Sequence, residues 1–380
     1  MANTLTNLIP DIYRALDVVS RELVGFIPSV ARDSTADRVA ANQTLDIPIS
    51  PVNAAGGNIT PAMALPSASD QVIGKATLTI TKQRFFPFSW TGEEQKAVDY
   101  GPGFLTLKQY QIAQAIRAAV NEMEADLAAA AYKGASRAYG TAGTAPFGTA
   151  GDYSDAAQTR KILADNGAPL SDLSLIMNTV AGANIRGKQA QNYMVGDTSV
   201  QRQGVLLDIN GFSLRESAQV QAVTKGTGAS YLVNNAGGYS VGATTIAADT
   251  GTGTILAGDI ITFAGDTNKY VVASALSGGS LTIAAPGLRQ SLADNTAITV
   301  GNSYAANIGF SRNSILLATR LPAIPAEGDL ASDRLTVADP NSGIMLEFAT
   351  YPGYRMNVYH VSVCWGVSVI KPEHVAILLG

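Results

Sequence analysis

Cysteine and histidine are nearly absent, with one cysteine and two histidines among 380 residues. Cys364 has no partner for an internal disulfide, so we expect a reduced, buried thiol. His360 and His374 have no cysteine or further histidine at the spacing of a metal site, so no bound metal is predicted. His360 also lies in an alternating apolar segment, which favours an ordinary strand histidine over a ligand.

Charge is scarce as well: charged residues make up 15% of the chain, against about a quarter in an ordinary soluble domain. We therefore expect other protein to cover part of the surface. The net charge of -4 argues against a broad basic field that would grip nucleic-acid phosphates. No run reaches the roughly 18 apolar residues of a membrane span, and Met1–Pro10 lacks the features of a signal peptide. These absences predict a protein made and kept in the cytoplasm, without a membrane partner.

Motifs for chemistry are missing or weak. Neither a dinucleotide fingerprint nor a phosphate-binding loop occurs, so no cofactor is predicted. The segment Gly238–Gly242 matches the G-x-S-x-G pattern of a serine nucleophile, but the residues after it indicate a strand where that site needs a helix. The neighbouring carboxylates Glu93 and Glu94, and Glu122 and Glu124, are interpreted as solvated surface. No catalytic residue is predicted.

Glycine is abundant, with 37 residues, and its mixture with Thr, Ala and Ser favours turns and short strands. Ile12–Phe26 has apolar residues at three- and four-residue spacing, which predicts a short amphipathic helix. Leu45–Ile49 and Thr77–Thr81 alternate between apolar and polar residues, which predicts two strands joined by a long turn. Such a two-stranded arm buries little apolar surface, so we expect it to need a partner surface.

An aromatic run follows this arm in the sequence. We predict that the arm docks on a neighbouring copy of the chain; the alternative, that it folds back on its own domain, stays open. The residues predicted to contact the neighbour are Ile47, Ile49, Lys75, Lys82, Phe85, Phe86, Phe88 and Trp90.

The clearest element is a long helix over Leu105–Gly134, in which apolar residues from Ala113 to Ala130 form one stripe. Thr106 and Gln109 match a capping box at its start, and Gly134 occupies the place of a left-handed cap at its end. At 1.5 Å per residue the helix would span roughly 40 Å.

A region of mixed helices and strands follows a loop over Arg137–Gly151. Asp155–Asp165 and Ala183–Gln191 indicate helices, and Leu173–Met177 indicates a buried strand. From Ala222 to Val300 the residues are dominated by Thr, Ala, Gly, Ile and Val, which predicts an all-β insert in the form of a small barrel or sandwich. The closing strands are predicted over Ser314–Thr319, Ile344–Ala349 and Tyr354–Ile370.

This order of elements resembles the HK97-fold coat proteins of tailed bacteriophages, and among them the P22 coat-protein family. The residues that carry the resemblance touch most of the chain: MANTLTNLIPDIY at the start, INGFSLRESAQV at Ile209–Val220, NIGFSRNSILLATRLP at Asn307–Pro322, and the ending GVSVIKPEHVAILLG. The resemblance implies an α+β, HK97-like capsid fold with an N-terminal arm, an extended β loop, a long spine helix in a peripheral domain, an axial α/β domain and an inserted small all-β domain.

The resemblance also implies a domain layout. It assigns 1–40 to the N-terminal arm with its short helix, 41–92 to the extended β-hairpin loop, 93–150 with the C-terminal strands 344–380 to the peripheral domain, 151–221 and 301–343 to the axial domain, and 222–300 to the inserted β domain.

The function implied is that of a major capsid protein, which assembles through hexamers and pentamers into the icosahedral head of a tailed phage around double-stranded DNA. Scaffolding and portal proteins are the expected assembly partners, and packaged DNA lies close without specific contact. The expected location is the virion capsid, assembled in the cytoplasm of the host bacterium. Some shells of this fold are cross-linked between a lysine of the extended loop and an asparagine, but no matching pair can be placed here, so no cross-link is predicted.

Two other functions stay open at this point. One is an encapsulin-like cellular compartment built on the same fold. The other, from a different class, is a secreted β-rich carbohydrate-binding protein or hydrolase, in which the Gly- and Thr-rich insert would bind the ligand.

Overall fold

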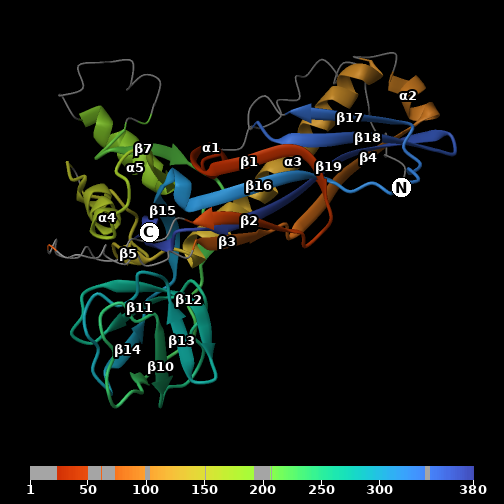
Figure 1. The fold of residues 1–380 in the computed structure, drawn as a ribbon. Coiled ribbons are helices and arrows are strands. Elements are labelled where there is room, and N and C mark those ends of the chain that lie inside the picture. Colours follow the sequence, from red (N-terminus) through yellow and green to blue (C-terminus); the bar gives the residue numbers. More distant parts are fainter. Residues whose placement is uncertain are drawn as a thin grey trace.

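The computed structural model describes residues 24–49, 61, 73–98, 103–149, 151–191, 206, 208–338 and 343–380. In this part of the chain, helices and strands are mixed, and the strands form a six-stranded sheet, a twelve-stranded sheet and a two-stranded hairpin (Figure 1). The α+β class expected from the sequence is thereby confirmed. The predicted helix Ile12–Phe26 lies almost entirely outside the described residues.

The six-stranded sheet is an elongated layer with the long helix α3 (Phe104–Lys133) packed on one face. Its central strand β19 is hydrogen-bonded to β4 on one side, and to β16 and β18 on the other. Its strands are β1 (Ala31–Val39), β16 (Ile315–Pro322), β19 (Met356–Val369), β18 (Met345–Gly353), β17 (Asp333–Ala338) and β4 (Lys82–Thr91).

Helix α3 confirms the predicted spine but differs from the prediction at both ends. It begins at Phe104, directly after Gly103, and no side chain caps it, so the expected capping box at Thr106 is wrong. At its other end Gly134 is not left-handed, with a φ of -95°. Gly134 is needed for another reason, because a Cβ there would lie 2.7 Å from a methyl group of Val369.

The twelve-stranded sheet has two parts. The part next to α3 contains β5 (Arg137–Tyr139), β20 (Val375–Leu379), β15 (Tyr304–Ser311), β6 (Leu173–Met177) and β7 (Phe212–Glu216), with the short strand β8 (Ala222–Val223) paired to β15. Helices α4 (Ser154–Asp165) and α5 (Thr179–Gln191) pack against it. All five residues of β6 are buried, as the apolar run in the sequence predicts.

The second part is a ring of antiparallel strands, visible as the lobe at the bottom of Figure 1. Following the hydrogen bonds gives the order β11-β14-β9-β10-β13-β12, and β12 also pairs with β11, so the ring closes on itself. The strands are β9 (Tyr231–Val233), β10 (Thr245–Asp249), β11 (Ile260–Phe263), β12 (Lys269–Ser277), β13 (Ser280–Ile283) and β14 (Ala297–Val300). A hydrophobic cluster of its own fills this barrel, and β12 joins it to β5.

Strand pairing over long sequence distances differs from the layout implied by the resemblance. Strand β20, assigned with residues 344–380 to the peripheral domain, lies in the twelve-stranded sheet between β5 and β15. Strand β16, expected in the axial domain, lies in the six-stranded sheet, and β1 of the N-terminal segment pairs with it in parallel. The predicted loop Arg137–Gly151 begins with the strand β5. Local periodicity does not specify a partner strand, which accounts for these differences.

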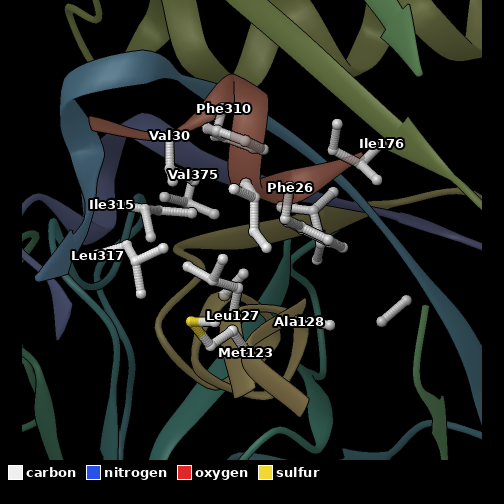
Figure 2. Close-up of a cluster of buried hydrophobic side chains, with 14 of the residues drawn as sticks. Phe26, Val30, Met123, Leu127, Ala128, Ile176, Phe310, Ile315, Leu317 and Val375 are labelled. Atoms are coloured by element: carbon white, nitrogen blue, oxygen red, sulfur yellow. The ribbon is translucent and has the colours of Figure 1, made fainter. Parts of the chain in front are cut away.

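The main hydrophobic core lies where α3 meets both sheets (Figure 2). Met123 and Leu127 come from α3, Leu317 from β16 and Phe310 from β15. The short helix α1 (Phe26–Ser29) places Phe26 in the same cluster.

Candidate functional site

The arm predicted from the sequence is present as a hairpin of β2 (Thr44–Ile49) and β3 (Gly74–Thr79), paired antiparallel. Its base packs on the six-stranded sheet, on the face opposite α3: Leu78 and Ile80 are buried in one cluster with Ala318 and Cys364. Leu45 and Ile47 pack against the same cluster. The base of the arm therefore folds back on its own chain.

The other face of the hairpin is exposed. Lys75 forms an ion pair of 2.8 Å with Asp46 across the two strands, and Thr77 donates a hydrogen bond to the same carboxylate. The hydrogen bond from Lys75, followed by that from Thr77, lowers the pKa of Asp46. Ile49 pairs with Gly74 through the backbone. The contact of Ile47, Ile49 and Lys75 with a neighbouring copy stays a prediction.

The aromatic run predicted to reach a neighbour lies instead on β4, which pairs with β19 along its whole length. Trp90 is buried in a cluster with Val98 and Tyr359, and its indole N–H donates to Gln111 of α3. Phe88 stacks on Tyr359 with ring centroids 5.1 Å apart.

Phe86, two residues earlier on the same face of β4, packs against the main core. Phe86, Phe88 and Trp90 thus pack mainly against side chains of their own chain. Residues 82–91 belong to the six-stranded sheet, so the extended loop ends before residue 82 and not at residue 92. The alternation of apolar and charged residues from Lys82 to Trp90 could have indicated a sheet strand.

Lys82 also serves its own chain. Its ammonium group lies 2.8 Å from Asp126 and 3.2 Å from Glu122, both on α3, while Arg84 lies 2.9 Å from Glu122. The indole N–H of Trp365 donates to the other oxygen of Asp126 at 2.8 Å. Burial by itself would lower the pKa of Lys82, but the hydrogen bonds to Asp126 and Glu122 and their negative charges outweigh this effect and raise the pKa. These groups join β4 and β19 to the spine helix.

Replacing Lys82 with methionine is expected to lower the free energy of unfolding by about 1 kcal/mol, because two carboxylates lose a partly buried cation. The matched variant Lys75→Met, at an exposed pair, should leave stability unchanged. Since the pKa of Lys82 is raised, its contribution is present below the ordinary lysine pKa of 10.5 and is lost as the pH rises through the higher folded value. Urea unfolding of both variants at pH 7.5 checks this; equal midpoints would contradict it.

Phe85 is the one member of the aromatic run that points away from α3, and it is 59% exposed. It lies against His360, with centroids 4.9 Å apart, and Tyr351 contacts the same imidazole at the same distance. Partial burial lowers the pKa of His360. Pro87, next to Phe85 on the outer strand, has no N–H to offer an added strand. Phe85 thus stays more than half exposed, and its contact with a neighbouring copy remains a prediction.

A shallow groove runs between the outer edge of β4 and helix α3. Its volume is about 330 Å³, and it is lined by Phe86, Pro87, Phe88, Gln111, Gln114, Ala115 and Ala118. The lining carries no charged side chain that could direct a reaction.

Two carboxylates predicted to be solvated are buried. Glu94 caps helix α2 (Gly92–Val98): its carboxylate accepts the N–H of Thr91 at 2.8 Å, and the Thr91 hydroxyl accepts the N–H of Glu94. The Thr-x-x-Glu spacing was the signal for this capping box. Glu124, on the buried side of α3, has no exposed surface and accepts four hydrogen bonds. Glu122 pairs with Lys82 and Arg84, so it is a partner of β4.

The G-x-S-x-G segment Gly238–Gly242 lies in turns of the barrel, and strand β10 follows it. A nucleophile elbow needs a helix there, and the strand predicted after the segment is confirmed. Within the described ranges, no group of three or more His, Cys, Asp or Glu side chains could hold a metal ion. No helix in the same ranges combines the length and the apolar character needed to cross a membrane.

An elongated sheet with a spine helix on one face and a folded arm on the other defines a fold that solved structures share. No protein-family model and no curated protein matches the chain. A chain of the capsid structure of the cyanophage P-SCSP1u is similar at a TM-score of 0.52 and 12% identity, over 96% of this chain and 91% of that one. A chain of the structure of Mycobacterium phage Che8 is similar at a TM-score of 0.50 and 12% identity, over 99% and 98% of the two chains. At this identity the likeness establishes a common fold.

Proposed function

We propose that this protein is the major capsid protein of a tailed bacteriophage, which assembles with copies of itself into an icosahedral shell around double-stranded DNA. The observation that carries the proposal is the similarity to the capsid chain of cyanophage P-SCSP1u, which extends over nearly the whole length of both chains. A likeness over 96% of this chain and 91% of that one is more than a shared supersecondary motif.

The finer assignment is part of the same proposal. We assign the fold to the HK97 type and the chain to the P22-like family, with the closed barrel of β9–β14 as an inserted domain. Hexamers and pentamers form the lattice, scaffolding and portal proteins take part in assembly in the host cytoplasm, and the DNA is held without specific contacts. Catalysis is not required for this role.

Exposed apolar side chains around the six-stranded sheet support self-association. Ile73 next to β3, Phe85 on β4, Leu335 on β17 and Tyr354 at the β18–β19 turn are each more than half exposed. A monomer gains nothing from such surfaces, whereas contacts with several neighbours at once add up in a lattice. Arm docking on a neighbouring subunit supplies one of these contacts.

Deleting Val52–Ser69, a segment of which residue 61 alone is among the described residues, tests the role of the arm. Both ends of the deletion lie beyond β2 and β3, so the packing of Leu78 and Ile80 is kept and the subunit should stay soluble and folded. We expect the wild-type chain to form closed shells in negative-stain micrographs and the deletion variant to form none. Regular shells from the variant would refute this role of the arm, and a wild-type chain that stays monomeric at high concentration would refute the proposed function.

A further inference from the structure

The carboxylate of Glu124, on the spine helix, binds the backbone of residues 25–27. Glu124 accepts hydrogen bonds from the backbone N–H groups of Gly25 at 2.5 Å, Phe26 at 2.7 Å and Ile27 at 3.0 Å, and from the hydroxyl of Ser217 at 2.9 Å. Its side chain is completely buried. Burial raises the pKa of Glu124, while these four donors act in the opposite direction. A buried carboxylate with four donors has a single geometry in which all are satisfied.

The segment held in this way lies between the two sheets. Phe26 stacks on Phe310 of β15, in the twelve-stranded sheet, with parallel rings and centroids 6.3 Å apart. In the same cluster lie Leu317 of β16, from the six-stranded sheet, and Met123 of α3 (Figure 2). Helix α1 thus packs on the spine helix and on β15, and it leads through Val30 directly into β1 of the six-stranded sheet; we call it the wedge.

The backbone at Gly25, directly before α1, has no room for a side chain. A Cβ at Gly25 would lie 2.9 Å from the carbonyl oxygen of Glu216 and 3.0 Å from a methyl group of Ile176. Glu216 ends β7, and Ser217, which follows it, donates both its hydroxyl to Glu124 and its N–H to the carbonyl of Met177 in β6. Glu124 thus connects the spine helix to the end of β7 as well as to α1.

We propose that Glu124 is a positioning residue for assembly: by holding α1 as a wedge, it fixes the angle between the six-stranded and the twelve-stranded sheet, and with it the curvature of the shell. The inference rests on the proposed function. Identical subunits close into one shell size only if each presents its contacts at the same angle, so a loosened wedge changes the product of assembly. We expect the soluble subunit to keep its fold, because the four hydrogen bonds to Glu124 are not part of the strand pairing of either sheet.

The variant Glu124→Gln is the direct test. Glutamine keeps one carbonyl oxygen but turns an NH₂ group toward backbone N–H donors, so at least one of the four hydrogen bonds is lost. We expect the amides of residues 25–27 to exchange hydrogen about tenfold faster or more in the soluble subunit, with exchange in β19 and β15 unchanged. Micrographs should then show shells of mixed diameter or open sheets. The matched control Glu93→Gln, at an exposed position on α2, should behave as wild type in both measurements.

Gly25→Ala reaches the same wedge without altering the carboxylate, and it serves if Glu124→Gln fails to fold. Both variants giving fast exchange at residues 25–27 together with irregular shells would support the inference. Fast exchange with shells of wild-type diameter would overturn it, since Glu124 would then act on stability alone, and unchanged exchange would overturn it as well. A wild-type chain that makes no shells would instead remove the proposed function, and the inference with it.

Discussion

Replacing Gly366 with alanine is expected to lift the base of the β2–β3 hairpin from the six-stranded sheet and to open access to Cys364. A Cβ at this position of β19 would lie 2.2 Å from the carbonyl oxygen of Thr79 and 2.9 Å from a methyl group of Leu78. The first of these is a backbone atom, so the hairpin itself must move. Cys364 lies in the cluster that the hairpin covers, two residues from the substitution.

Thiol labelling measures this movement. In the wild-type subunit Cys364 is buried, and burial raises the pKa of its thiol to about 11, so reaction at pH 8 should be very slow. Overpacking typically costs roughly 1–3 kcal/mol, which would accelerate labelling about five- to 150-fold if the hairpin opens. Gly92→Ala is the matched control, because a Cβ there has no atom within 4 Å. Equal labelling rates in wild type and Gly366→Ala would contradict the assignment of Gly366 to hairpin docking.

Elements with a strong local pattern could be predicted from the sequence. The stripe through Val120, Met123 and Leu127 gave helix α3, and the apolar run Leu173–Met177 gave the buried strand β6. The hairpin β2–β3 followed from strict alternation on both strands. In each case the residues that form the element also determine it, so no distant partner had to be known.

Elements defined by distant partners could not be predicted. The sequence of β1, ARDSTADRV, is polar and shows no alternation, and it is a strand only because β16 pairs with it in parallel. Glu124 looks like one of several helix carboxylates until the chain brings Gly25 and Ser217 to it from 99 and 93 residues away. The same applies to Lys82. From the sequence it was predicted to contact a neighbouring copy, but in the fold it pairs with Glu122 and Asp126 of its own chain.

Residues 224–303, produced alone, are expected to fold into the barrel seen in the whole chain. The six strands close a ring without help from the rest of the protein, and fourteen buried residues form a separate cluster inside it. The ends of the segment already meet, since the N–H of Lys225 donates to the Ser303 hydroxyl at 3.2 Å and its ammonium group to Asn302 at 3.3 Å. Adjacent ends are typical of a domain inserted into another.

Isolation removes the pairing of β12 with β5, the hydrogen bond from the buried side chain of Arg137 to Asn268, and the packing of Ile260 and Val271 in the main core. Stability of a few kcal/mol should remain for a segment of this size. We expect dispersed amide resonances and a cooperative thermal transition. Ile261→Asp, which places a charge in the core of β11, should abolish both, while Thr299→Asp, exposed on the neighbouring strand, should not. A fragment without a cooperative transition would mean that the barrel depends on the body of the subunit, and the proposal of an inserted domain would fail.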